Sequence, residues 1–206
     1  MKYPFFASFI VFCIWLAYEI RKSRKAQEQA SQSFWEREAA ANSTRRKSLD
    51  DLDYIRIPFD SFPMDLLADD PQIHEIHKTL HGLSESGPIV NLTGISNTDL
   101  KLRYGAPNIN LLTLYDQKYT TLARTLQDFA SVLYESGYHR EACQILEFAV
   151  STHTDVSSSY KLLVSLYREQ GQEEKIAELL PVAESLNSSL RPSIVRLLQE
   201  ACGRNS

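Results

Sequence analysis

The stretch YESGYHREACQILEFAV, residues 134–150, is matched 34 positions later by REQGQEEKIAELLPVA, residues 168–183. In both stretches a glutamate stands two residues before a glycine. The same spacing relates six pairs of positions: Leu126 and Tyr160, Phe129 and Leu163, Leu133 and Tyr167, Gly137 and Gly171, Leu146 and Leu180, and Ala149 and Ala183. Self-similarity at a fixed period of this length indicates a structural repeat.

The repeated pattern resembles the tetratricopeptide repeat, whose period is 34 residues. The resemblance covers about residues 118–203 and implies pairs of antiparallel helices, joined at a glycine-containing turn, with small residues where the helices pack closely. Ala142 and Ala149 match the small positions of the first unit. In the second unit Ile176 replaces a small residue, and Pro181 is expected to interrupt the second helix. The Trp and Gly usual in the first helix of this family are absent.

The pattern continues for half a unit in RPSIVRLLQEACG, residues 191–203. This segment opens with a proline at its second position and ends with a glycine, as single helices do. We expect it to cap the last repeat, because the ends of helical solenoids need a cover. Since about three repeats are needed for a stable core, segments before residue 118 are expected to complete it.

The predicted fold class is all-α, with an N-terminal transmembrane helix, a helical stalk and a small solenoid of helical hairpins similar to tetratricopeptide repeats. The predicted segments are a transmembrane anchor (1–20), a basic juxtamembrane stalk (21–47), an extended linker packing on the domain (48–70), a helix and loop segment (71–117), two repeats (118–188), and a capping helix with a tail (189–206). The chain also looks like small bacterial membrane proteins that carry such repeats.

The anchor is predicted from the run between Tyr3 and Tyr18, which has no charged side chain. Sixteen residues span roughly 24 Å, which is short of the ~30 Å bilayer core. Three alternatives are a cleaved signal peptide, a lipid attached to Cys13, and a helix lying in the interface. The sequence lacks the small-residue cleavage pattern, a small residue before Cys13, and a polar face. We expect an uncleaved single span.

The orientation follows from the basic residues behind this run: Arg21, Lys22, Arg24 and Lys25. Only Lys2 precedes the run, so the positive-inside rule predicts a single-pass protein of the cell membrane with a cytoplasmic C-terminal domain. The same four side chains are candidate membrane-surface residues, because each attracts anionic lipid by about 1 kcal/mol.

The charge is unevenly divided along the chain. Residues 1–47 hold nine Lys or Arg and four Asp or Glu, whereas the remainder holds thirteen and twenty-two, for net charges of +5 and −9. An acidic domain lacks the basic face that phosphate contacts need, so no nucleic-acid partner is expected. Three cysteines make no disulfide scaffold and fit a reducing cytoplasm.

The linker at 48–70 has prolines at 58 and 63, which exclude a regular helix. It also carries apolar side chains that need cover. We therefore expect four of them to dock on the helical domain: Ile55, Ile57, Phe59 and Phe62.

A helix is predicted at 71–81, with Asp70 as N-cap, Pro71 at its first position and Gly82 at its end. His74, His77 and His81 share one of its faces. Two of them could bind a transition metal, but no carboxylate or cysteine completes a ligand set at a recognised spacing. The other interpretation is a polar flank beside the buried stripe, and we assign no metal and no cofactor.

The loop at 91–104 is rich in hydroxyl and amide side chains, which either form a small-ligand pocket or satisfy the loop's own backbone. A short helix is expected within 96–105, capped by Ser96 or Asn97 and stopped by Gly105. No phosphate loop, nucleophile elbow or dinucleotide motif occurs, so no catalytic residue is assigned and the protein is not expected to be an enzyme. The alternative function is a ligand-binding or enzymatic one that uses this loop or the histidines at 74–81.

The resemblance to tetratricopeptide repeats implies a concave groove, lined by the first helices of successive repeats, that holds a peptide or a partner protein. Side chains three or four positions apart place seven candidate groove residues on these helices: Arg124, Gln127, Ser131, Tyr134, Lys161, Ser165 and Arg168. They depart from the Lys/Asn pattern that clamps a C-terminal carboxylate, and they are also compatible with an ordinary solvated face. The predicted function is a membrane-tethered adaptor or assembly factor that does no catalysis.

Overall fold

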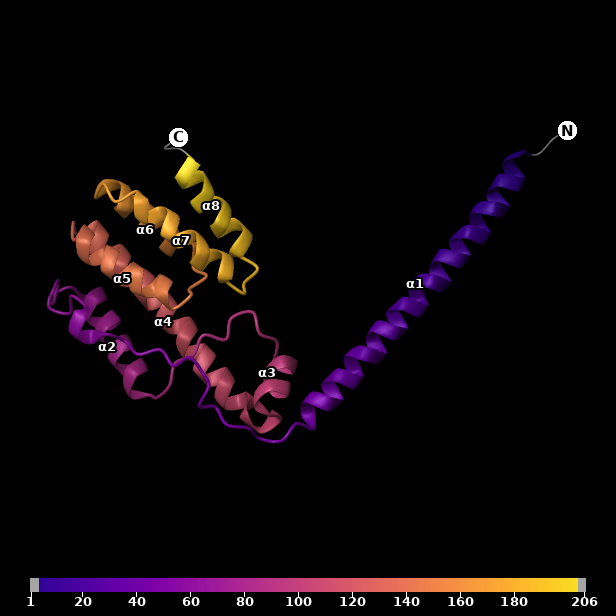
Figure 1. The fold of residues 1–206 in the computed structure, drawn as a ribbon, viewed down its shortest axis with the longest axis horizontal. Helices are drawn as coiled ribbons and strands as arrows, with labels where there is room; N and C mark the ends of the chain where they lie inside the picture. Colours follow the sequence, from indigo (N-terminus) through magenta and orange to yellow (C-terminus); the bar gives the residue numbers. More distant parts are fainter. Residues whose placement is uncertain (1–3, 204–206) are drawn as a thin grey trace. The chain divides into compact units, whose positions relative to one another are not determined.

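The computed structural model describes residues 4–203, apart from the side chains of residues 4–7 and of Ala26. Within these residues the chain forms eight α-helices, two short 3-10 helices and one isolated β-bridge, with no strand (Figure 1). The predicted all-α class is therefore confirmed. The chain divides into two compact units, which are Met1–Lys47 with Asn97–Asn108, and Ser48–Ser96 with Ile109–Ser206.

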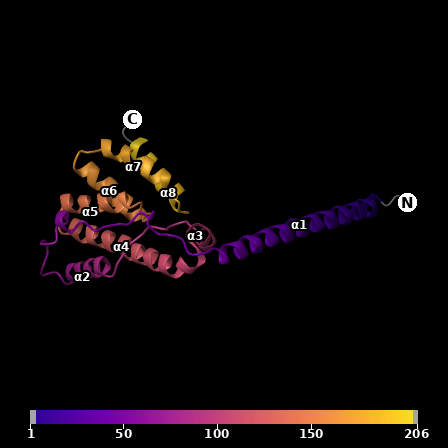
Figure 2. The same ribbon diagram turned by 60° about the horizontal axis from the view of Figure 1, so that its bottom comes forward.

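The larger unit is built from one helix that precedes the repeats and from five consecutive helices. The helices are α2 (Pro71–Glu85), α4 (Ile109–Glu135), α5 (His139–Ser151), α6 (Ser157–Glu169), α7 (Glu174–Ser185) and α8 (Arg191–Gly203). Each of α4 to α7 packs on the next helix, and α6 also packs on α4 and α8 (Figure 2). One prediction is corrected: the first repeat helix begins at Ile109, nine residues before the expected start.

Two tight turns with the same backbone geometry join the helices of the two hairpins. Gly137 and Gly171 have φ angles of +84° and +66°. After the first helix of each hairpin, the glycine N–H donates three residues back, to Tyr134 and Arg168 respectively. The next N–H donates five residues back, from Tyr138 to Leu133 at 2.8 Å and from Gln172 to Tyr167 at 2.7 Å. This pairing is the Schellman motif, in which a residue without Cβ adopts φ > 0 at little cost.

The positions related by 34 residues form the core of the stack. Of the large residues in the six pairs, all are buried except Leu180, which is half-buried. The predicted small positions, Ala142 and Ala149, have no exposed surface, and Ile176 is 1% exposed.

Pro181 corrects another expectation, because α7 continues through it to Ser185. The proline side chain lies on the exposed face of α7. Because proline has no N–H, the helix lacks one backbone hydrogen bond at this position. The carbonyl that is left free lies on the exposed side of the helix, where it can accept from water.

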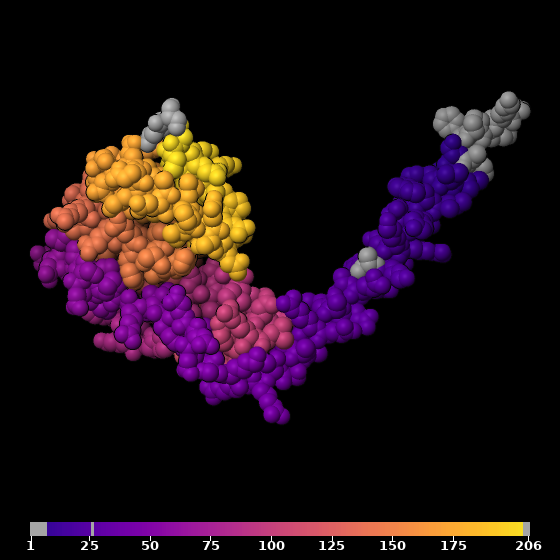
Figure 3. Space-filling view, viewed as in Figure 1, coloured from indigo at the N-terminus to yellow at the C-terminus, as the bar shows by residue number. Residues whose placement is uncertain are grey.

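Both ends of the stack are covered by further helices. At one end α8 buries Ile194, Leu198 and Ala201 against α6 and α7, and Figure 3 shows this helix in yellow lying against the orange segments of the preceding hairpin. At the other end α2 packs on α4. Its N-cap is as predicted, with the Asp70 carboxylate accepting from the Gln72 and Ile73 N–H groups. However, α2 runs through the exposed Gly82 and ends at Glu85, four residues beyond the predicted range of 71–81.

The linker docks on the larger unit, which confirms the prediction for its four apolar side chains. Phe62 is 7% exposed and packs edge-to-face on Phe148, with 5.3 Å between the ring centroids. Phe59 stacks on the His81 ring at 4.5 Å. The Ile55 N–H donates to the Ile89 carbonyl at 3.0 Å, while the Ile55 and Ile57 side chains are half-buried against the core.

The smaller unit consists of α1 (Pro4–Asn42), α3 (Asn97–Tyr104) and a 3-10 turn (Ala106–Asn108). The 39 residues of α1 form one helix of roughly 58 Å that ends at Asn42, five residues before the predicted end of the stalk at residue 47. α3 packs on its C-terminal part. Two ion pairs join them: Lys101 with Glu38, and Arg37 with Asp99 at 2.5 Å.

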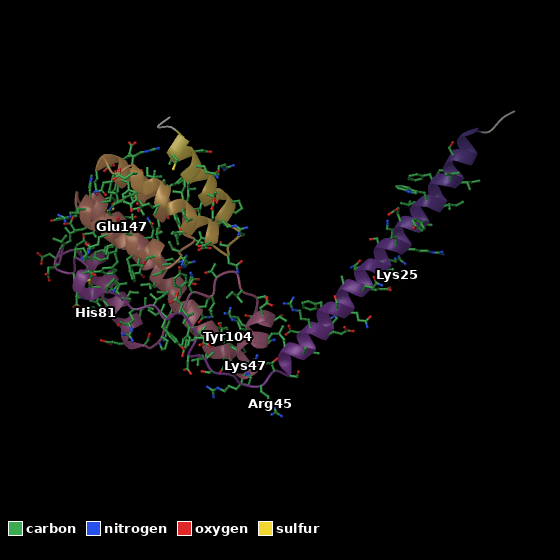
Figure 4. The ribbon with its side chains drawn as sticks, in the orientation of Figure 1. Lys25, Arg45, Lys47, His81, Tyr104 and Glu147 are labelled. Atoms are coloured by element: carbon green, nitrogen blue, oxygen red, sulfur yellow. The ribbon has the colours of Figure 1, made fainter. Side chains whose placement is uncertain are left out.

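The backbone after α1 is held against the end of α3, where Figure 4 labels Arg45, Lys47 and Tyr104. The Lys47 N–H donates to the Tyr104 carbonyl at 3.0 Å, and the Ala106 N–H donates to the Thr44 carbonyl at 3.1 Å. Gly105, predicted as the stop of this helix, has φ of +94°. A Cβ there would lie 2.2 Å from the Arg45 carbonyl oxygen, so both conformation and space require glycine.

Within the described residues, no helix combines the length and the apolar character needed to cross a bilayer. The predicted anchor at 1–20 lies partly outside the described residues, since residues 1–3 and the side chains of 4–7 are not described. The transmembrane helix is not confirmed and stays a prediction.

The packing of the repeats predicts the outcome of a matched pair of substitutions. Ala149→Arg places a cation at a fully buried position of α5, whereas Ala177→Arg places the same side chain on the exposed face of α7. We expect the first to lower the free energy of unfolding by about 3 kcal/mol or more, because a buried charge lacks a partner there. The second should change it by less than about 0.5 kcal/mol. Urea unfolding of the full chain in detergent measures both, and equal midpoints would contradict the helix packing.

Candidate functional site

The first helices of the hairpins lie side by side and run in the same direction. On α4 and α6, the Ser159 hydroxyl donates to the Gln127 amide oxygen at 2.7 Å. Further along the same two helices, the Tyr134 hydroxyl donates to the Glu169 carboxylate at 2.9 Å. On α6 and α8, the Arg168 guanidinium donates to the Ala201 carbonyl at 2.8 Å. The residues in these contacts are 32 to 35 positions apart, so they follow the repeat period.

Two hollows open on the face formed by these helices. The hollow between α6 and α8 has a volume of about 480 Å³, and the hollow between α4 and α6 has a volume of about 350 Å³. Lys161 and Ser165 line both of them. The two hollows therefore form one continuous surface, which we call the first-helix groove.

The structure brings six of the seven predicted groove residues together on this surface. Gln127, Ser131 and Tyr134 line the hollow at α4, and Arg168 lines the hollow at α8. Arg124 is exposed on α4 but lines neither hollow. The sequence analysis missed the third wall of the groove, which comes from Ser193, Arg196, Leu197 and Glu200 on α8. The signal for it was the half-unit at 191–203, which was interpreted only as a cap.

Several groove side chains are engaged in holding the helices together. Gln127 accepts from Ser159 and donates to the Ser131 hydroxyl at 3.0 Å. Glu169 accepts from Tyr134 with one carboxylate oxygen and lies 2.9 Å from His139 Nδ1 with the other. The hydrogen bond and the charge of Glu169 raise the pKa of the Tyr134 hydroxyl. These residues fix the shape of the groove rather than offer free groups to a ligand.

Lys161 differs from these residues. Its side chain is exposed, and it makes no ion pair with any side chain that the structure describes. Arg196 has only a distant partner, Glu200, at 3.9 Å, and both side chains are more than half exposed. The groove thus presents unneutralised positive charge in a part of the chain that carries a net charge of −9.

The predicted membrane-surface residues lie elsewhere, on α1 in the smaller unit. Arg21, Lys22, Arg24 and Lys25 are all exposed, within a single turn and a half of the helix.

The loop at 91–95 uses its polar groups to hold neighbouring backbone. The Asn91 amide donates to the carbonyls of Thr152 and His153, at 3.0 Å each. The Leu92 N–H donates to Asp116 at 3.0 Å. The adjoining hollow has a volume of about 210 Å³, which is below the roughly 300–1,000 Å³ of small-molecule sites. The rest of the predicted pocket segment forms α3, which belongs to the smaller unit.

The same hollow contains a serine, a histidine and an aspartate, but their contacts do not form a catalytic relay. Ser185 Oγ lies 3.4 Å from His153 Nδ1 and donates instead to the Val182 carbonyl at 2.7 Å. The Asp155 carboxylate accepts from Ser188 at 2.6 Å. A nucleophile needs a base at hydrogen-bond distance that is itself oriented by a third group, and this arrangement does not provide one.

The three histidines of α2 lie in different environments. His74 and His81 are exposed, whereas His77 packs edge-on against Phe129, with 5.4 Å between the ring centroids. The buried His77 Nε2 has no hydrogen-bond partner among the described residues. Burial lowers the pKa of His77, and the charges of His81 and His74 lower it further. Among the described residues, no three His, Cys, Asp or Glu side chains are grouped so as to hold a metal ion.

Comparison with known proteins gave no match to a protein-family model, to a curated protein or to a solved structure. The arguments about function therefore rest on the site itself.

The environment of His77 predicts how stability depends on pH. Its pKa is lowered in the folded state, so the unfolded chain binds the proton more tightly. The stability that comes from neutral His77 is complete above the unfolded pKa of about 6.5 and is lost as the pH falls from there through the lower folded pKa. His77→Leu should remove this loss and, by removing an unsatisfied nitrogen, raise stability by about 1 kcal/mol.

The measurement is urea unfolding of the full chain in detergent at pH 7.5 and pH 5. His74→Leu, on the exposed face of the same helix, is the matched control and should keep most of the pH dependence of the wild type, because burial lowers the pKa of His77 more than the charge of His74 does. If His77→Leu loses as much stability as the wild type on acidification, the half-buried environment of His77 does not cause the pH dependence.

Proposed function

We propose that this protein is a membrane-tethered interaction module, an adaptor or assembly factor, that holds a segment of another protein in the first-helix groove. The observation that carries the proposal is the continuity of the two hollows across three parallel helices. A groove that is open along its length accommodates a polypeptide, whereas an enclosed cavity is typical of a small-molecule site.

The repeat pattern supports the same function. Helical hairpins stacked at a 34-residue step resemble tetratricopeptide repeats, whose first helices form a peptide-binding surface. Here the helices α4, α6 and α8 supply that surface, and interhelical hydrogen bonds fix it before a partner arrives. A preformed surface binds at a lower entropic cost than one that must be ordered on binding.

The tether is proposed from the apolar run at 3–18 and the four cations that follow it. In α1 the large apolar side chains from Phe9 to Ile20 are exposed, because no other described part of the chain covers them. A bilayer would cover them, and the cations at 21–25 would meet anionic headgroups on the cytoplasmic side. The proposed location is the cell membrane, with the helical domain in the cytoplasm and no catalytic role.

One crosslinking experiment tests the groove and the tether together. A photoreactive benzoylphenylalanine replaces Ser165, at the centre of the groove, or the exposed Ala177 on α7 as a control. Membranes of cells that make the full chain are washed at high pH and then irradiated. We expect the chain to stay in the membrane pellet, and adducts with a discrete partner to form from position 165 and not from 177.

Equal adducts from both positions, or none from 165, would count against the groove. Release of the full chain by the high-pH wash would count against the tether.

A further inference from the structure

The hollow between α6 and α8 combines an apolar floor with a charged rim. Val164 and Ala201 are each 6% exposed, and Leu197 is half-buried, so a ligand at the floor meets hydrocarbon. The hydroxyls of Ser165 and Ser193 stand beside this floor. Such a surface accepts one apolar side chain of limited size, flanked by polar groups.

The rim carries three cations and one carboxylate. Lys161 and Arg168 come from α6, while Arg196 and Glu200 come from α8. Arg168 commits one nitrogen to the Ala201 carbonyl, but a guanidinium has five N–H donors and keeps the others. Lys161 has no ion-pair partner among the described residues, and Arg196 is only weakly paired. Both sides of the rim therefore carry positive charge that can pair with negatively charged groups of a ligand.

The acidic character of the chain after residue 47 makes the groove the preferred place for a negatively charged ligand. That part has thirteen basic and twenty-two acidic side chains, so an acidic ligand is repelled by most of its surface. Local attraction within general repulsion confines such a ligand to the groove and fixes its register. A basic ligand would instead be attracted to many places and have no preference for this hollow.

We propose that the segment held in the groove is an internal stretch of a partner protein in which acidic residues flank an apolar one. The apolar side chain lies on Val164 and Leu197, one carboxylate meets Lys161, and the other meets Arg196. This inference rests on the proposed function and specifies its partner. It requires no free chain end, because the recognised charges belong to side chains.

The test uses three fluorescent nonapeptides with acetylated and amidated ends. The probe repeats Ser-Glu-Leu-Glu, one comparison peptide has lysine in place of glutamate, and the other has serine in place of leucine. Fluorescence anisotropy is measured with the full chain in uncharged detergent. We expect the probe to bind at least tenfold more tightly than either comparison peptide, since each exposed ion pair and the buried side chain add to affinity.

Matched charge reversals locate the binding. Lys161→Glu should lower the affinity for the probe by about tenfold, because it replaces attraction with repulsion at the rim. Lys78→Glu makes the same change in net charge on the exposed face of α2 and should leave the affinity unchanged. Tighter binding of the lysine peptide, or equal effects of the two reversals, would overturn the inference.

The two levels of the proposal fail in different ways. If the probe does not bind while Ser165 still crosslinks to a partner, the acidic class is wrong and the groove remains a binding site. If neither happens, the proposed function itself fails. Probe binding that survives Lys161→Glu but is lost in a Ser165→Trp variant would place the probe in the groove without the Lys161 contact, and it would overturn the proposed recognition of acidic residues.

Discussion

The architecture of the larger unit depends on two chain reversals of the same geometry, 34 residues apart. At Gly137 and Gly171 the backbone enters the left-handed region, and the same pair of hydrogen bonds closes each preceding helix. A Cβ at either glycine would meet no described atom within 4 Å, so conformation rather than space demands glycine there. Because both turns direct the chain in the same way, the two hairpins repeat and their first helices become parallel neighbours.

This arrangement explains how residues far apart in the sequence come to share one surface. Close approach of the helices depends on buried alanines at 142, 149 and 183, which leave room for the facing helix. Hydrogen bonds from Ser159 to Gln127 and from Arg168 to the α8 carbonyl then tie the first helices together. Side chains left out of these hydrogen bonds, Lys161 above all, are the ones that the proposed partner would contact.

Local signals in the sequence predicted much of the fold. The Asp70 cap, the glycine turns and the docking of the proline-rich linker each follow from a few neighbouring residues. The early start of α4 was missed because the repeat register was placed at residue 118, although no Pro or Gly interrupts the chain between Pro107 and Gly137. Pro181 was given too much weight, since its effect depends on which face of the helix it occupies.

The candidate site was predicted less completely than the fold. Spacing placed six side chains on the groove, but it did not show which of them are used in interhelical hydrogen bonds. That distinction depends on tertiary distances, such as the one between Tyr134 and Glu169. The contribution of α8 to the groove was missed for a different reason, because a half-unit has no second helix to complete the pattern.

The stacked repeats require that α6 lies about as far from α4 as from α8. Spin-label distances test this arrangement most directly. Labels would be placed in pairs at 131 and 165, 165 and 200, and 131 and 200, in a full chain whose three native cysteines are replaced. Neighbouring packed helices lie about 8–10 Å apart, so the first two pairs should give similar short distances and the third roughly twice as long a distance. A third distance as short as the first two, or a clear inequality between those two, would contradict the stacked-repeat account.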